Sequence, residues 1–551
     1  MDKAMNMGKS SATGSFQLLI GVVASTVIMA LGTLVLGWIL SRDQLGLYGV
    51  ALIPSSMINF FRDWGVNSAM TKQIASLRAA GKESEIRDVI ISGTVFEVIS
   101  GAVLSALCFS VADLLAGFLR MPDASLPIAV MSLSIFAGAV LSAATNIFVG
   151  FERMKLNSLT TILQAATKTA IGPLLVILGF GVLGAIIGAT VSLVIAAAVG
   201  ITIVYIALFR PLSKVKTGRR EIGKILKPML SYGVPLTIAN TVIGVSPLLF
   251  TFLMAPIAGT SLMGDYYAAS YFTVLLTFFT IPISTALFPA FAKVNVATEP
   301  DLLKTVFASS VKYTSVLVVP ATMIVMALSG PMISTLWLGK FPYAPLFLSL
   351  IVIINLYVVF GSLSLGSLMT GIGVTSQLML QSLVSLAASV PLVIILVAFS
   401  GVLSPLLGAI IGILGILLSS LPGTVWGLFW VWRRYRVKAD FRVAVKILAT
   451  SSIAAVASYL TASLVQVNLV LFGFSVWTTT VASLFLGFVV FMVLYLGLAP
   501  IAGAINQVDV NNMRMMFGGS GIVSKILELP FRFMERSLKI RRTRPEPGDV
   551  V

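Results

Sequence analysis

Residues 209–227 read FRPLSKVKTGRREIGKILK, and this basic segment indicates how the rest of the chain is organised. It carries seven Lys and Arg residues against one acid, Glu221. Six apolar runs precede it and eight follow it, and each is long enough to cross a bilayer, which takes about 20 residues. Because positively charged connections between membrane spans stay in the cytoplasm, the segment fixes the predicted orientation of its neighbours.

The composition excludes a soluble globular protein. Of the 551 residues, 58% are hydrophobic and 10% are charged, whereas about 25% charged is usual in soluble domains. The mean hydropathy is +1.03. We therefore predict an all-α polytopic membrane protein with about fourteen spans. The spans are expected near residues 15–40, 45–61, 89–118, 126–149, 156–178, 182–208, 229–256, 266–288, 302–328, 344–369, 378–399, 402–432, 447–465 and 476–498.

The spans fall into a predicted sequence of five parts, with both termini in the cytoplasm and the chain in the inner (cytoplasmic) membrane. An even number of spans and the charges at both ends require this placement of the termini. The parts are a six-helix bundle (1–208), the basic linker (209–228), a second six-helix bundle (229–432), two additional spans (433–504) and a basic tail (505–551), amphipathic and then disordered.

The net charge of +17 does not indicate nucleic acid. With this topology, all but five of the 37 Lys and Arg residues lie on the cytoplasmic side, where they attract anionic membrane lipid. The sequence has one cysteine, Cys108, and no histidine, which excludes an intrachain disulfide and the usual zinc sites. We expect no metal and no cofactor.

The segment 62–88 has apolar residues at helical spacing, at Val66, Met70, Ile74 and Leu77. This spacing predicts an amphipathic helix that lies at the cytoplasmic interface.

Two pairs of matching segments indicate an internal repeat. Residues 183–188 and 407–412 share the sequence LGAIIG, at corresponding places in the sixth and twelfth spans. Residues 46–51 (GLYGVA) and 264–269 (GDYYAA) both open the second span of their halves. Six spans per half predict parallel repeats about an axis along the membrane normal. The small residues of LGAIIG are also typical of close helix packing, and the two interpretations are compatible.

The segment 37–75, GWILSRDQLGLYGVALIPSSMINFFRDWGVNSAMTKQIA, resembles the N-terminal signature of the polysaccharide-transporter flippases. These belong to the multidrug, oligosaccharidyl-lipid and polysaccharide exporter superfamily. Residues 231–235, SYGVP, and the division of spans into six, six and two resemble the same family. The resemblance implies a flippase that moves a polyprenyl-diphosphate-linked glycan from the inner to the outer leaflet by alternating access. It implies no cofactor.

Ionisable residues within spans are candidates for function because burying them in a bilayer is costly. Lys168 lies near the middle of the fifth predicted span, one turn after Gln164. Its ammonium can hold a phosphate or a uronic acid. The alternative is a structural lysine neutralised by a carboxylate such as that of Glu97.

Glu97 and Lys312 occupy similar places in the third and ninth predicted spans. Glu97 is a candidate for binding a coupling proton or sodium ion, and a structural salt bridge is an equal alternative. Lys312 belongs either to the substrate cavity or, by extending its side chain, to the interface. Arg62 and Asp63 are expected to form a local pair or gate on the cytoplasmic side.

Further polar side chains in second-half spans complete the predicted substrate cavity, although each is also typical of a bond between helices. They are Tyr232, Asn240, Tyr313 and Asn355.

Two other functions are alternatives to a flippase. A multidrug or cation-coupled exporter of the same superfamily favours carboxylates over lysines in its cavity, since typical drugs are cations. A membrane enzyme such as a polysaccharide polymerase needs a sizeable loop for its catalytic groups, and the longest predicted non-cytoplasmic connection has about a dozen residues. We therefore expect a transporter and no enzyme, with glycan-assembly enzymes as candidate partners.

Overall fold

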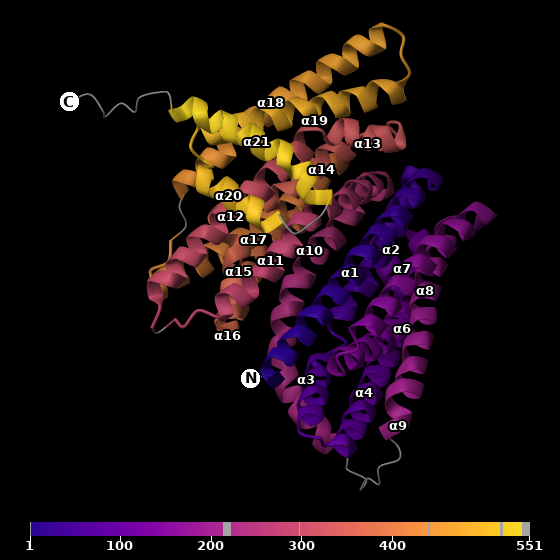
Figure 1. Ribbon diagram of the computed structural model, residues 1–551. Helices are drawn as coiled ribbons and strands as arrows, with labels where there is room; N and C mark the ends of the chain where they lie inside the picture. Colours follow the sequence, from indigo (N-terminus) through magenta and orange to yellow (C-terminus); the bar gives the residue numbers. More distant parts are fainter. Residues whose placement is uncertain are drawn as a thin grey trace. The chain divides into compact units, whose positions relative to one another are not determined.

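The computed structural model describes residues 2–212, 222–296, 298–399, 401–438, 441–517 and 522–542, and the regular elements in these ranges are all helices (Figure 1). The predicted all-α class is confirmed. Residues 213–221 of the basic linker and 543–551 of the tail lie outside the described residues.

The helices follow one another with short connections. The first part of the chain contains α1 (Asp2–Ile39), α2 (Arg42–Phe60), α3 (Val66–Ala79), α4 (Glu83–Ser110), α5 (Ala112–Phe118), η1 (Pro122–Ala124), α6 (Ser125–Gly150), α7 (Met154–Leu175), η2 (Val176–Phe180), α8 (Gly181–Ile203), η3 (Val204–Phe209), α9 (Arg210–Leu212) and α10 (Ile222–Phe272). The second part contains α11 (Val274–Ala292), α12 (Pro300–Ala327), α13 (Ser329–Trp337), α14 (Ala344–Val352), η4 (Ile353–Phe360), α15 (Ser362–Gly371), α16 (Thr375–Ala398), α17 (Pro405–Tyr435), α18 (Phe441–Leu471), α19 (Val476–Ile501), α20 (Gln507–Phe517) and α21 (Ile522–Arg542).

The lengths and hydropathies of these helices are those of a multi-pass membrane protein. Within the described ranges, ten stretches of helix are long and apolar enough to cross a membrane. Two further helical stretches, Ala344–Phe360 and Ser362–Gly371, meet at a bend of 59°, and the number is eleven if together they form one span. One of the ten, Met154–Leu212, is broken at Gly179, where φ is 96°, and its two parts, α7 and α8, pack against each other. The predicted number of fourteen spans stays a prediction.

The chain forms two compact units, and their boundaries differ from those of the predicted bundles. Unit 1 comprises Met1–Tyr271 with Leu386–Ser419, and unit 2 comprises Phe272–Ser385 with Ser420–Val551. The compact units are defined by contacts within the structure and do not test whether one half of the sequence duplicates the other. The duplication of two six-span halves therefore stays a prediction.

Unit 1 is built on α4, α6, α7 and α8, with α1 packed along α7. Helix α3 confirms the predicted amphipathic pattern but not its placement at the interface. Val66, Met70 and Ile74 are fully buried, and α3 packs against α4 and α6. The apolar face of α3 is therefore covered by protein, because neighbouring helices offer it a closer-packed surface than lipid headgroups do.

The glycines of both LGAIIG segments lie in close helix contacts. A Cβ atom on Gly188 would overlap the backbone of Gly172 on α7, and one on Gly412 would meet the Met254 side chain on α10 at 2.7 Å. Small residues let helix backbones approach in this way. The packing interpretation of the segments is therefore supported, although the two copies contact different neighbours.

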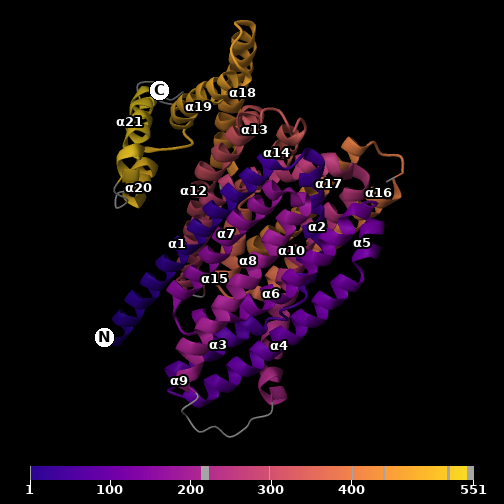
Figure 2. The ribbon, with the colours of Figure 1, turned by 90° about the vertical axis from the view of Figure 1, so that its right-hand side faces the viewer.

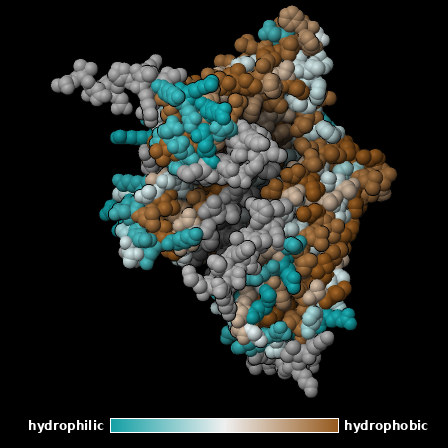
Figure 3. All heavy atoms as spheres, viewed as in Figure 1, coloured by the Kyte–Doolittle hydropathy of each residue, from teal (hydrophilic) through white to brown (hydrophobic). Residues whose placement is uncertain are grey.

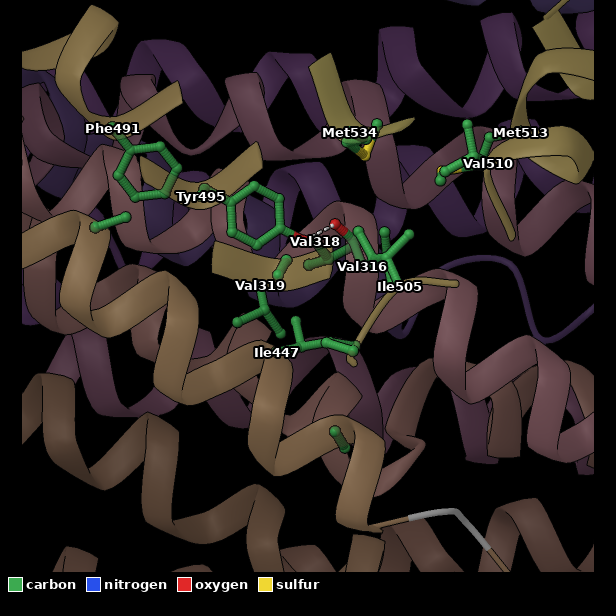
Figure 4. Packing of buried hydrophobic residues seen from close by; sticks show 14 of the residues in the cluster. Val316, Val318, Val319, Ile447, Phe491, Tyr495, Ile505, Val510, Met513 and Met534 are labelled. Atoms are coloured by element: carbon green, nitrogen blue, oxygen red, sulfur yellow. Dashed lines mark hydrogen bonds between the residues drawn. The ribbon is translucent and has the colours of Figure 1, made fainter. Parts of the chain in front are cut away.

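Unit 2 has an extensive apolar cluster where α12, α18 and α19 meet α20 and α21 (Figures 2 and 4). Val316 and Val319 of α12 pack there with Ile447 of α18 and Phe491 of α19. The Tyr495 hydroxyl donates a hydrogen bond of 3.0 Å to the Val316 carbonyl, so the polar end of this buried ring is satisfied. In Figure 3, apolar side chains cover the flank over α7 and α8, whereas polar ones gather over α20 and α21.

We predict that Gly188→Ala destabilises the protein by about 1–3 kcal/mol, because the added methyl group must push α7 and α8 apart. Thermal unfolding in detergent measures this as a fall in Tm. Gly138→Ala on α6 is the control, since a Cβ atom there meets nothing within 4 Å. Equal Tm values for the two variants would contradict the close contact.

Candidate functional site

Buried carboxylates mark the positions where charge enters the protein interior. Among the described residues, three acids are buried: Glu97, Asp265 and Asp509. Each contacts a cation from another part of the chain. An unpaired charge in apolar surroundings is very unfavourable, so these three pairs constrain how the surrounding helices pack.

The first pair joins α2 to α10. Arg42 donates to both carboxylate oxygens of Asp265, from Nε at 3.1 Å and from Nη2 at 2.5 Å. Asp265 is fully buried. Two parallel hydrogen bonds of this kind fix the orientation of the guanidinium as well as its position.

The sequence at the start of α2 presents Arg42 for this contact. Ser41 caps the helix: its hydroxyl accepts from the Gln44 backbone N–H, and the Gln44 side chain accepts from the Ser41 N–H. Such a capping box fixes the first turn, which contains both Arg42 and Asp43.

Asp43 extends the junction between α2 and α10. Its carboxylate accepts hydrogen bonds from the hydroxyls of Thr260 at 2.7 Å and Ser261 at 2.5 Å. These bonds, chiefly that from Ser261, lower the pKa of Asp43 below its ordinary value. They lie just after Gly259, where φ is 73° and α10 is kinked.

The two matching segments GLYGVA and GDYYAA contact each other at this junction. A Cβ atom on Gly46 would overlap the Thr260 carbonyl, and one on Gly264 would overlap the Arg42 carbonyl. The sequence singled out these segments only as a repeat. Asp265 was not predicted as a site residue, and the signal that could have found it is an acid within an otherwise apolar stretch.

The second pair lies within unit 1. Arg62, in the turn after α2, donates from Nη1 to Oε2 of Glu97 on α4, and both side chains are buried. Asn67 donates to the other Glu97 oxygen at 3.0 Å. The Arg62–Asp63 pair predicted from the sequence was wrong: Asp63 instead accepts from the Asn67 backbone N–H at 2.9 Å, at the start of α3. Arg62 reaches the deeper carboxylate because α4 passes beside the turn.

Lys168 on α7 has no carboxylate or hydrogen-bond partner among the described residues. Its predicted neutralising partner, Glu97, is occupied by Arg62. Gln164 and Lys168 are four residues apart and so share a face of α7. The opposite face exposes Leu159, Ala166 and Leu174 and is the one suited to lipid. Lys168 therefore lies, half-buried, on the face of α7 opposite to these exposed residues.

The third pair lies within unit 2. Lys312 on α12 contacts Oδ2 of Asp509 on α20 at 2.6 Å. The neighbouring Tyr313 hydroxyl accepts from the Asn512 side chain at 2.8 Å and contacts the other Asp509 oxygen at 3.3 Å. Lys312 and Tyr313 thus bind α20, a role that the sequence does not predict.

The remaining predicted residues are less informative. The Asn355 side chain donates to the Val352 carbonyl at 3.1 Å, within its own turn. Tyr232 and Asn240 belong to α10, but their side chains lie outside those described.

Among the described residues, each unit contains a cavity. A cavity of about 1020 Å³ in unit 2 is lined almost wholly by apolar side chains of α11, α12, α13, α19 and α21. A polar cavity of about 480 Å³ in unit 1 lies between α3, α4 and the start of α10, and Lys72, Glu85 and Asp88 line it. Within the described ranges, no group of three or more Cys, Asp or Glu side chains is arranged to hold a metal ion.

Comparisons with known proteins point to one group. The sequence profile of a family described as "Polysaccharide biosynthesis protein" matches residues 11–295. A search of curated proteins finds no match.

Solved transporters have a similar fold. The lipid II flippase MurJ, in its inward closed conformation, has a TM-score of 0.65 and 16% identity over 87% of this chain and 97% of its own. An inward-facing multidrug resistance MATE family transporter of the MOP superfamily has a TM-score of 0.62 and 16% identity over 76% of this chain and 98% of its own. A MATE structure in the straight conformation has a TM-score of 0.52 and 18% identity over 78% of this chain and 96% of its own. The resemblance predicted from residues 37–75 is confirmed.

We predict that Glu97→Gln lowers the free energy of unfolding by about 3–5 kcal/mol, because it leaves the Arg62 guanidinium buried without a counter-charge. Chemical or thermal unfolding in detergent measures the loss. The matched control on the same helix is Glu85→Gln, which removes the exposed pair with Lys82 and should cost about 0–1 kcal/mol. Similar losses for the two variants would contradict the burial of the pair.

Proposed function

The chain belongs to the polysaccharide biosynthesis protein family, and from this premise we propose that it is a flippase for a polyprenyl-diphosphate-linked oligosaccharide. The cargo moves from the inner to the outer leaflet by alternating access, and the protein transports it without chemical change. The protein lies in the inner membrane with both termini in the cytoplasm.

The observation that carries this proposal is Lys168, for which the described residues supply no carboxylate partner. It lies on the face of α7 opposite to the exposed residues Leu159 and Leu174, with Gln164 one turn away. A lysine at such a position binds a diphosphate as a point charge, and a glutamine beside it can hydrogen-bond a sugar hydroxyl. Two other buried or half-buried cations of the described helices and turns have a counter-charge: Arg62 pairs with Glu97, and Lys312 pairs with Asp509.

The apolar cavity of unit 2 supports the proposal that the cargo carries a lipid chain. Its lining includes Leu276, Pro320, Phe485 and Phe488 and carries almost no polar surface. A branched hydrocarbon chain such as a polyprenyl tail gains free energy in such a cavity by leaving water or disordered lipid for a shaped apolar wall.

Alternating access requires contacts that close one end of the transporter and then break. In the predicted topology, Arg42 and Asp265 lie at the non-cytoplasmic ends of their spans. Their bidentate pair, with the Asp43 hydrogen bonds beside it, holds α2 against α10. We propose that these contacts form the closed outer gate and separate when cargo is released.

A multidrug or cation-coupled exporter is the second candidate, and the fold shared with MATE transporters is compatible with it. A cationic drug needs an available carboxylate. Within the described membrane helices, the buried acids Glu97 and Asp265 each face an arginine, and Lys168 would repel a cation. The charges therefore favour an anionic cargo over a cationic one. A polysaccharide polymerase remains a more remote candidate, since the connections between the described helices include no large loop for its chemistry.

Uphill transport needs a driving ion, and Glu97 is the proposed site for a proton or sodium ion. Arg62 must withdraw before an ion binds, because a carboxylate paired with a guanidinium has no net charge to attract one. Enzymes that assemble the glycan on the inner leaflet are the proposed protein partners.

We predict that Lys168→Gln lowers the rate of glycan flipping about tenfold or more, the size expected for loss of one charged hydrogen bond to a phosphate. Lys168→Arg should retain most of the activity because it keeps the charge. The measurement is the accumulation of lipid-linked glycan on the cytoplasmic leaflet of cells that depend on each variant.

Lys446→Gln is the control, since it removes an exposed cation at the start of α18. Normal flipping by a correctly inserted Lys168→Gln protein would remove Lys168 from the site. Export of cationic drugs without glycan flipping by the unaltered protein would favour the second candidate.

We predict that Asp265→Asn opens the outer gate, because it removes the charge that holds Arg42. The reporter is Val50→Cys, one turn beyond Gly46 on α2 and fully buried, in a Cys108→Ala background. Labelling by a membrane-impermeant maleimide from outside should become about tenfold faster, as expected for loss of one charged contact. The control is Asp113→Asn, an exposed acid that contacts Ser125. Unchanged labelling of the Asp265→Asn protein would refute the gate.

A further inference from the structure

The tail helix α20 is fastened to the membrane helices by a small polar contact. Asp509 accepts from Lys312 at 2.6 Å and lies 3.3 Å from the Tyr313 hydroxyl. Asn512, one turn later, donates to Tyr313 at 2.8 Å. Asp509 and Asn512 thus present one face of α20 to two consecutive residues of α12.

The start of α20 holds Asp509 in place for this contact. The Asn506 side chain accepts from the Asp509 backbone N–H at 2.9 Å, and the Asp509 carboxylate accepts from the Asn506 N–H at 2.8 Å. This reciprocal arrangement is a helix cap. The Asp509 carboxylate therefore both caps the N-terminus of α20 and binds this helix to α12.

Helices α20 and α21 are tied to each other and so form one body. Arg514 of α20 contacts Glu528 at 3.3 Å and Glu535 at 2.9 Å, both on α21. The hydrogen bond from Arg514 is the main cause that holds the pKa of Glu535 below its ordinary value, so the pair is ionised at neutral pH. Gln507 also contacts Glu535, at 3.3 Å.

This body covers part of the apolar cavity of unit 2. Met513 of α20 and Phe531 and Met534 of α21 line the cavity, together with Ile505 from the preceding turn. Figure 4 shows Ile505, Val510, Met513 and Met534 lying against Val316, Val318 and Tyr495. The opposite side of α21 is charged and exposed, as at Arg532 and Arg536. The apolar side of this helix pair therefore forms part of the cavity wall, and charged residues lie on its other side.

The connection to α19 allows the pair to turn as a body. Gly503 lies two residues after the end of α19, and its φ of 72° is a conformation that other residues rarely adopt. The side chain of Lys312 is 21% exposed whereas that of Asp509 is 5% exposed, so water can reach one partner of the contact. A single ion pair that water can reach exchanges more readily than a fully buried one.

We propose that α20 and α21 form a hinged lid over the apolar cavity, with the Lys312–Asp509 pair as its latch and Gly503 as its hinge. Opening of the lid admits a hydrocarbon chain to the cavity, and closing holds the chain there away from water. The identity of that chain as a polyprenyl tail rests on the proposed function. The lid itself does not.

The test measures exposure of the inner face of the lid. The reporter is Met513→Cys, which is 5% exposed in the closed lid, in a Cys108→Ala background of the full-length protein in nanodiscs. A water-soluble maleimide should label it about tenfold faster when Asp509→Asn or Lys312→Gln is added, as expected for loss of one charged hydrogen bond. Asparagine at position 509 retains an oxygen for the Asn506 N–H, so α20 keeps its cap.

The matched control is Lys304→Gln, which removes a cation of α12 whose only described salt bridge is the exposed pair with Asp301. It should label at the parent rate. Labelling of both latch variants at the parent rate would overturn the lid. The labelling needs no cargo, so it tests the lid independently of transport. If the latch variants label faster but the protein flips no glycan, the proposed function is refuted and the lid is not.

Discussion

A charge buried in an apolar interior must have a counter-charge beside it, and this requirement organises the structure. Removing an ion from water costs far more than any single contact returns, so a buried acid is tolerated only where another element brings a cation to it. Asp265 receives Arg42 across the α2–α10 junction, Glu97 receives Arg62 within unit 1, and Asp509 receives Lys312 within unit 2. Each pair thus joins segments that are far apart in the sequence.

Lys168 differs from these cations because no described carboxylate reaches it. A cation on the inner side of a membrane helix is stable only if water or a bound anion accompanies it. Among the described residues, the three neutral pairs hold helices together, whereas Lys168 is a cation within a membrane helix that is available for an anionic cargo. This division is the physical basis for favouring a phosphate-bearing lipid over a cationic drug.

The close approach of helices depends on glycine as the pairs depend on charge. Gly46 and Gly264 let the backbones of α2 and α10 come near enough for Arg42 to reach Asp265, and Gly188 brings α8 onto α7. In a membrane, association of helices relies on such packing because the lipid tails are as apolar as the side chains. Charge and shape act together at the α2–α10 junction, and the proposed gate there needs both a specific closed state and contacts weak enough to break.

The sequence by itself determined the class of the protein. Runs of about 20 apolar residues, the basic segment at 209–227 and the motif at 37–75 are local patterns, and local patterns suffice to predict membrane helices and the superfamily. The sequence also marked Lys168, Glu97 and Lys312 as charges in unusual places. Only the tertiary structure decided their partners: Arg62 turned to Glu97 rather than to its neighbour Asp63, and Lys312 bound Asp509 across 196 intervening residues. The physical reason is that pairing depends on which helices lie side by side, and residues far apart in the chain carry no local signal of that contact.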